Sequence, residues 1–167
     1  EGDHIEPGVS VVLDEEKRGS RANMGFNFLA CVGNAARVVG GEAKGRKGVV
    51  TGHHGGVEHV TIDFDDAVLA KLNIDDKILI EGFGQGLKLL DFPEIKVYNL
   101  DPGVFHRLPV RVLPAKKLEV GVAAIVPAEL MGSGMGHNNI GTGDCDIMTH
   151  DPQAVKRFGL DKMCFGD

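Results

Sequence analysis

The sequence contains no tryptophan and a single tyrosine, and aromatic residues make up only 5% of its 167 residues. The core must therefore be filled mostly by valine, isoleucine and leucine, which suit β-strands. There are three cysteines and no CxxC spacing, which excludes a disulfide scaffold and indicates free thiols in a reducing compartment. No run of 18 apolar residues and no signal-peptide pattern is present. We therefore expect a soluble, cytoplasmic protein without a membrane partner.

Positive charge is also scarce. The formal net charge is −6, and basic residues gather only at Lys44, Arg46 and Lys47, with a short pair at Lys116 and Lys117. Nucleic-acid-binding proteins usually present a basic face, so the charge balance argues against nucleic acid as a partner.

Glycine, in contrast, is abundant: 24 residues without a collagen-like period, which indicates many turns and loops. In residues 36–64 the glycines separate short runs rich in valine, and Val60, Ile62 and Phe64 alternate with polar residues. Such runs are typical of antiparallel strands joined by tight turns. The sequence therefore predicts a mainly β fold, a small closed β-barrel with a few short helices, in which this segment supplies three strands.

The other segments carry weaker strand and helix signals. Residues 24–32 place apolar side chains at every second position, which favours a buried strand and leaves a short helix open. Asp65, Asp101 and Asp151 are N-cap candidates for helices over 67–73, 102–108 and 152–158. Further strands are predicted at 9–13, 77–81, 95–100, 109–113, 118–126 and 145–148, and one helical turn at 127–131.

We assign residues 1–100 to the barrel core and residues 101–167 to a second β/α lobe. The sequence begins without methionine, and residues 165–167 resemble a turn that opens another strand. We therefore expect the chain to pair with the rest of a longer protein. Pairing of exposed strand edges in a homo-oligomer is the alternative.

The first candidate site is the segment 53–59, which holds His53, His54, Glu58 and His59. Imidazole nitrogens and carboxylate oxygens are common ligands of divalent metals. Because adjacent residues of a strand point to opposite faces, only one of His53 and His54 can act together with His59. We assign His54 and His59 as metal ligands; the alternative is the polar rim of a hairpin.

The second candidate site is the glycine-rich loop 132–143 with the strand that follows. It lacks the Walker pattern and the third glycine of GxGxxG. Asp144 and Asp146 are two residues apart, so they share one face of a strand, where two carboxylates can share a cation. We predict Asp144, Asp146 and His137 as catalytic residues, with Asp146 also a metal ligand. The alternative is a surface loop before an ordinary edge strand.

Residues 41–50, GEAKGRKGVV, resemble the KOW motif of ribosomal and transcription-elongation proteins. The shared pattern, G-x-x-K-G-x-x-G-x-V, falls on Gly41, Lys44, Gly45, Gly48 and Val50. The resemblance implies a turn between strands of an SH3-like barrel. It also implies contacts from Lys44, Arg46 and Lys47 to RNA phosphates, which would weaken with salt.

Four phrases together resemble the uncharacterised domain-of-unknown-function 4438 family. They are GDHIEPGVS at 2–10, GEAKGRKGVVTGHHGGVEHV at 41–60, YNLDP at 98–102, and IVPAELMGSGMG through GDCDI at 125–147. The resemblance implies a β-barrel core related to the RIFT group and a longer parent protein. It implies no activity and no functional residue. The turns at 6–8 and 101–103 show a fainter similarity to acetamidase/formamidase-type hydrolases.

These observations lead us to expect a cytoplasmic enzyme, a metal-assisted hydrolase of a small-molecule ligand. Asp144, Asp146 and His137 would hold a divalent metal or activate water beside His54 and His59. The alternatives are a KOW-like barrel associated with RNA or the ribosome, and a structural oligomeric module.

Overall fold

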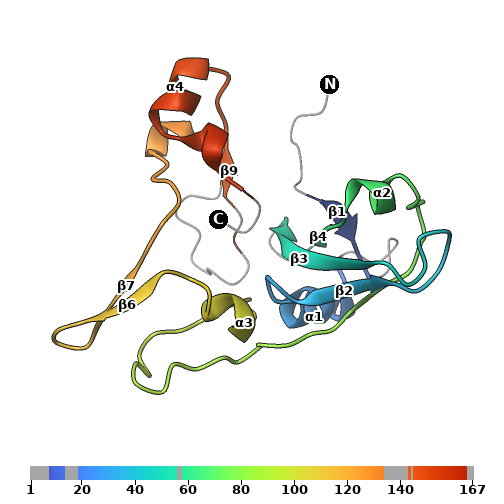
Figure 1. The fold of residues 1–167 in the computed structure, drawn as a ribbon, viewed down its shortest axis with the longest axis horizontal. Helices are drawn as coiled ribbons and strands as arrows, with labels where there is room; N and C mark the ends of the chain where they lie inside the picture. The colour runs from blue at the N-terminus through green and yellow to red at the C-terminus, as the bar shows by residue number, and fades with distance from the viewer. Residues whose placement is uncertain (1–7, 14–18, 56–57, 134–142, 144, 165–167) are drawn as a thin grey trace.

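A computed structural model describes residues 8–13, 19–55, 58–133, 143 and 145–164 of the chain. Strand outweighs helix, 28% against 21%, which confirms the predicted mainly β fold. Figure 1 shows the large N-terminal sheet on one side of the molecule and the smaller C-terminal elements on the other. The short helix α3 (Pro102–Phe105) lies between these two parts.

The large sheet has five antiparallel strands and curls into a half-barrel. Its strands stand in the order β1 (Val9–Val11), β4 (His59–Asp63), β3 (Lys47–His54), β2 (Ala35–Val38) and β5 (Ile78–Ile80). The three central strands come from the predicted segment 36–64. Within the described residues β1 and β5 are the edges of this sheet, so its strands form a half-barrel. The sequence predicted a closed barrel.

Branched aliphatic side chains fill the core, as the shortage of aromatic residues predicts. Val38, Val50, Val60 and Ile62 are at most 1% exposed. Burial of each such side chain contributes about 1.5–3 kcal/mol, so this cluster is the main source of stability of the half-barrel. Gly48 belongs to the same packing, because an added Cβ would lie 2.5 Å from the carbonyl oxygen of Asp63.

The strand favoured for residues 24–32 is wrong, because Arg21–Leu29 forms the helix α1. Ser20 caps it, and the Ser20 hydroxyl accepts a hydrogen bond from the backbone N–H of Asn23 at 3.2 Å. The buried face consists of Asn23 and Asn27, four residues apart, and is continued by Ala30. Apolar periodicity cannot detect a helix whose buried positions are amides.

Two further predicted helices are present but short. α2 (Asp66–Leu69) follows Asp65, and α3 follows Asp101, whose carboxylate accepts a hydrogen bond from the backbone N–H of Gly103 at 2.6 Å. None of the described helices is long and apolar enough to span a membrane.

The segment between β5 and α3 is mostly irregular. The strand predicted over 95–100 is wrong: this segment makes only isolated bridges, Lys96 with Lys88 and Leu100 with Val32. Asn99 has a φ of 48°, which interrupts an extended backbone. The segment is nevertheless tied to the sheet, since the N–H of Val32 donates to the carbonyl of Asn99 at 2.7 Å.

Asn34 is the buried polar centre of this junction, with 1% exposure. Its Oδ1 accepts hydrogen bonds from the backbone N–H groups of Cys31 at 2.9 Å and Phe83 at 3.0 Å. Its Nδ2 donates to the Phe83 carbonyl at 2.7 Å and to the Asp101 carboxylate at 3.0 Å. One amide thus joins the start of β2 to the segments that follow β5.

The C-terminal part contains two small hairpin sheets and short helices. The first sheet pairs β6 (Val110–Leu113) with β7 (Lys117–Val120), and the second pairs β8 (Met131–Ser133) with β9 (Asp146–Ile147). The strand predicted over 118–126 ends at Val120, and one further backbone hydrogen bond follows it, from the N–H of Gly121 to the carbonyl of Pro109 at 3.0 Å. The helical segments are η2 (Ala128–Leu130), α4 (Pro152–Arg157) and η3 (Leu160–Lys162).

Candidate functional site

The end of β3 and the start of β4 bring three histidines together. His54 lies directly opposite His59 in the antiparallel register, and His53 lies opposite Val60. The two neighbours His53 and His54 therefore have different surroundings, as strand alternation predicts. Figure 1 shows that this end of β3 lies on the side of the sheet that faces β9.

The imidazole of His53 holds α1 and β3 together. Its Nε2 lies 2.9 Å from the backbone carbonyl oxygen of Asn27, and because a carbonyl only accepts, the imidazole Nε2–H is the donor. Burial lowers the pKa of His53, and the hydrogen bonds to the Asn27 and Ala30 carbonyls oppose this effect without reversing it. A neutral imidazole therefore links α1 to β3, and it is committed to packing and not to a ligand.

His54 and His59 form an imidazole pair. Their rings are stacked, with centroids 5.7 Å apart and an interplanar angle of 10°. Nδ1 of His59 is buried and has no hydrogen-bond partner within the described residues. A buried polar atom of this kind usually has a partner, so a further group is expected beside it.

The pair can supply two nitrogen ligands to one ion after a small change in ring orientation. Two imidazole nitrogens on a tetrahedral zinc ion stand about 3–3.5 Å apart, because each Zn–N bond is about 2.0–2.1 Å. The stacked rings of His54 and His59 are farther apart than that at their centroids, 5.7 Å. To bind a common ion, one nitrogen of each ring would have to reach the shorter N–N separation.

The second predicted site is only partly described. Asp146 is the first residue of β9 and is half-buried, with its backbone opposite Ser133 in β8. Asp144 and His137 lie outside the described residues. Within the described part of the chain, no group of three His, Cys, Asp or Glu side chains is close enough to hold a metal ion. The roles assigned to Asp144, Asp146 and His137 stay predictions.

The basic residues of the KOW-like segment surround the β2–β3 turn. Lys44, Arg46 and Lys47 are all exposed. Ala43 anchors the turn with 1% exposure, and Gly45 has the positive φ of 86° that the turn requires. The turn therefore presents its positive charge to solvent.

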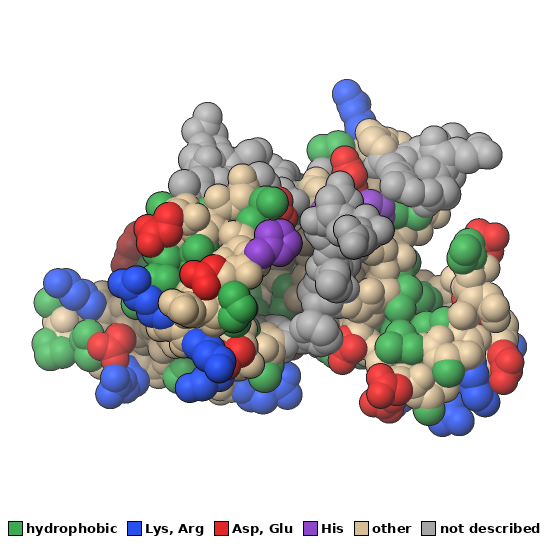
Figure 2. Space-filling view, turned by 90° about the horizontal axis from the view of Figure 1, so that it is seen from above, with side chains coloured by type: hydrophobic (Ala, Val, Ile, Leu, Met, Phe, Trp, Pro, Cys, Tyr) green, Lys and Arg blue, Asp and Glu red, His purple; other side chains and the backbone are tan. Residues whose placement is uncertain are grey.

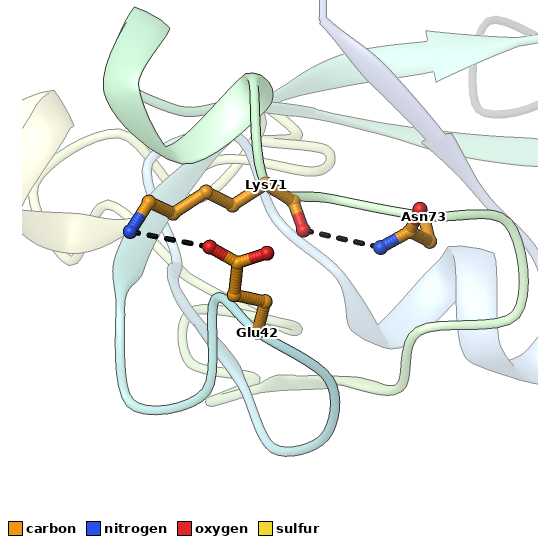
Figure 3. Close-up of polar contacts among 3 residues, drawn as sticks. All are labelled: Glu42, Lys71 and Asn73. Atoms are coloured by element: carbon orange, nitrogen blue, oxygen red, sulfur yellow. Dashed lines mark hydrogen bonds and ion pairs between the residues drawn. The ribbon is translucent and has the colours of Figure 1, made fainter.

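The charged residues next to this turn include one pair of like charge and one pair of opposite charge. Arg37 in β2 lies opposite Lys47 in β3, so two positive side chains stand next to each other on the sheet. Glu42 is instead paired with Lys71, whose Nζ lies 3.4 Å from a Glu42 carboxylate oxygen (Figure 3). The backbone carbonyl of Lys71 also accepts a hydrogen bond from the amide of Asn73 at 3.3 Å.

An apolar groove of about 540 Å³ is a feature that the sequence reasoning missed. It lies between residues 87–92, α3 and the β6–β7 hairpin. Its apolar lining includes Leu89, Phe92, Phe105, Val110, Val112 and Leu118. The alternation of Val110 with Val112, and of Leu118 with Val120, is the signal that could have revealed it.

Residues 1–106 match the family profile described as Domain of unknown function (DUF4438), N-terminal, and residues 107–167 match its C-terminal counterpart. The chain belongs to the DUF4438 family. This confirms the resemblance carried by its four sequence phrases.

The DUF4438 chain is also similar to a solved structure, the crystal structure of TM1086. The two sequences are 45% identical, with a TM-score of 0.77, over 93% of this chain and 53% of TM1086. The DUF4438 chain therefore spans about half the length of that relative. No curated protein matches it.

Proposed function

We propose that this DUF4438 chain is a metal-assisted hydrolase of a small-molecule substrate. The observation that carries the proposal is the stacked pair of His54 and His59, in which a buried nitrogen of His59 lacks a described partner. The two imidazoles would hold a divalent transition metal. Because no three His, Cys, Asp or Glu side chains of the described residues are close enough to hold an ion, Asp146 would complete the site only after the C-terminal hairpins move closer to the pair. Its cytoplasmic location belongs to the same proposal.

The chemistry follows from the ligand types. Imidazole favours zinc and similar transition metals, and catalytic zinc sites combine three protein ligands with a bound water. A zinc ion lowers the pKa of such a water to about 7, which supplies hydroxide at neutral pH. In this chain His54 and His59 would hold the ion, and the ion would supply the hydroxide that hydrolysis of an amide or ester bond requires.

Other assignments are not needed for this proposal. Asp144 and His137 would contribute if they approach the same ion. The RNA-associated barrel and the structural oligomeric module stay predictions, and the exposed Lys44, Arg46 and Lys47 are the residues on which the former depends.

Metal analysis of the purified chain tests the proposal. After incubation with Zn²⁺ and gel filtration, we expect about one retained ion per chain by mass spectrometry. His54→Ala, His59→Ala and Asp146→Asn should each weaken binding at least ~10-fold, since each removes a ligand. His106→Ala is the matched control, because His106 is an exposed histidine at the end of α3.

Two results would contradict the proposal at different levels. If the wild type and the His54 and His59 variants retain equal amounts of zinc, the two histidines do not bind the metal. Zinc bound through this pair, without hydrolysis of any amide or ester in a substrate panel, would reduce the protein to a metal-binding module.

A further inference from the structure

The β6–β7 hairpin has one apolar face and one polar face. In its register Val110 lies opposite Val120, and Val112 lies opposite Leu118. Because directly opposed residues point to the same side of a sheet, these four side chains form one face. The pair between them, Arg111 and Glu119, points to the other side and forms an ion pair.

The apolar face is only partly covered by the described chain. Val112 is 69% exposed and Val120 is 49% exposed, and the chain that follows adds Val122 at 71% and Ile125 at 78%. In Figure 2 the hairpin lies at the left end of the molecule, where hydrophobic side chains reach the surface between charged ones.

The apolar groove continues this face. Val110, Val112 and Leu118 form one wall of the groove, and residues 87–92 together with α3 form the other. Leu90 at its rim is 90% exposed. A two-stranded hairpin is marginally stable by itself, and a continuous apolar surface of this kind usually marks a site of association.

A relative of this chain contains additional polypeptide that could cover this surface. TM1086 shares 45% identity with this chain, yet the match covers only 53% of TM1086, so nearly half of that protein lies outside the shared part. We infer that the apolar face of β6–β7 and its groove are the docking surface for the polypeptide equivalent to that remaining part of TM1086. It can be joined to this chain or supplied by another one.

This occupant fits the surface better than a small ligand does. The lining of the groove is mostly leucine, valine and phenylalanine, and its two charged residues, Lys88 and Asp91, are exposed. A segment that lays apolar side chains between α3 and the hairpin would bury these residues and complete the packing of the hairpin.

A comparison of the same substitution in two proteins tests this inference. Val112→Lys and Val120→Lys are introduced into this chain, and lysine is placed at the aligned positions of full-length TM1086. In this chain we expect the melting temperature to change by less than about 2 °C, since both side chains are already exposed. In TM1086 we expect a decrease of about 10 °C, because an unpaired lysine would be buried.

Leu113→Lys, on the opposite face of the same hairpin, is the control in both proteins. It should change neither melting temperature by more than about 2 °C. The molecular mass of this chain in solution should not change with Val112→Lys. Small shifts in TM1086 at both aligned positions would overturn the inference. So would a dimer of this chain that Val112→Lys dissociates, because a second copy would then occupy the face.

Discussion

At the scale of single residues, buried amides organise this chain as much as its valines do. Asn34 makes four hydrogen bonds, to Cys31, to Phe83 twice and to Asp101, at 2.7–3.0 Å. The neighbouring Cys31 is fully buried, and burial, with the Asp101 charge as a smaller cause, raises the pKa of its thiol. This thiol is therefore a packing group and not a nucleophile.

Asn34→Ala should destabilise the protein by about 3–5 kcal/mol, because it removes four hydrogen bonds of a side chain that is 1% exposed and leaves the N–H of the buried Cys31 without its Asn34 partner. Urea denaturation measures the change. Asn73→Ala is the control: Asn73 makes a hydrogen bond to the Lys71 carbonyl at an exposed position, so its loss should cost less than about 0.5 kcal/mol. Equal effects of the two substitutions would contradict the role assigned to Asn34.

At the scale of elements, the sequence predicts the central strands and the helix caps, but it fails for the strands expected at 24–32 and 95–100 and for buried polar contacts. The central strands and the helices that begin after Asp101 and Asp151 follow from glycine turns, β-branched residues and N-cap chemistry, and all are present. α1 agrees with the short helix that the sequence left open as the alternative, and it was not favoured because it is held by Asn23, whose amide accepts from Leu13 and donates to Glu58. Such hydrogen bonds depend on distant partners that no local pattern contains.

The sequence likewise predicts the local part of the candidate site and not its long-range part. Strand alternation predicted that only one of His53 and His54 can act together with His59. The register of β3 and β4, which places His54 opposite His59, comes from the structure. Whether Asp146 approaches that pair depends on how the C-terminal hairpins pack against the half-barrel, and spacing along the chain carries no information about it.

The contact between α1 and β3 should make stability depend on pH. Folding lowers the pKa of His53 below its ordinary value of 6.5, so the unfolded chain takes up this proton more readily. His53 therefore costs no stability above that value, and its penalty grows as the pH falls below 6.5 through the folded pKa.

The unfolding free energy measured from pH 7.5 down to pH 5 should fall more steeply in the wild type than in His53→Gln. Glutamine keeps a side-chain N–H donor for the Asn27 carbonyl and does not titrate. His150→Gln, at an exposed position, should leave the wild-type slope unchanged. A His53→Gln slope equal to that of the wild type would show that this imidazole does not couple protonation to folding.

At the scale of the whole molecule, the buried core is distributed unevenly. Within the described residues every buried hydrophobic side chain lies between Ala30 and Val68, apart from Phe92 and Leu130. The half-barrel should therefore open only by global unfolding, whereas the β6–β7 hairpin can open locally at a lower free energy.

In this chain, amide hydrogen exchange in β6 and β7 should be at least ~100-fold faster than in β3 and β4. Mass spectrometry of peptic fragments measures the difference, and exchange in the edge strand β1 gives an internal reference for a strand that belongs to the large sheet. If the hairpin amides are as protected as those of β3, the apolar face is already covered in this chain, and the molecule unfolds as one unit.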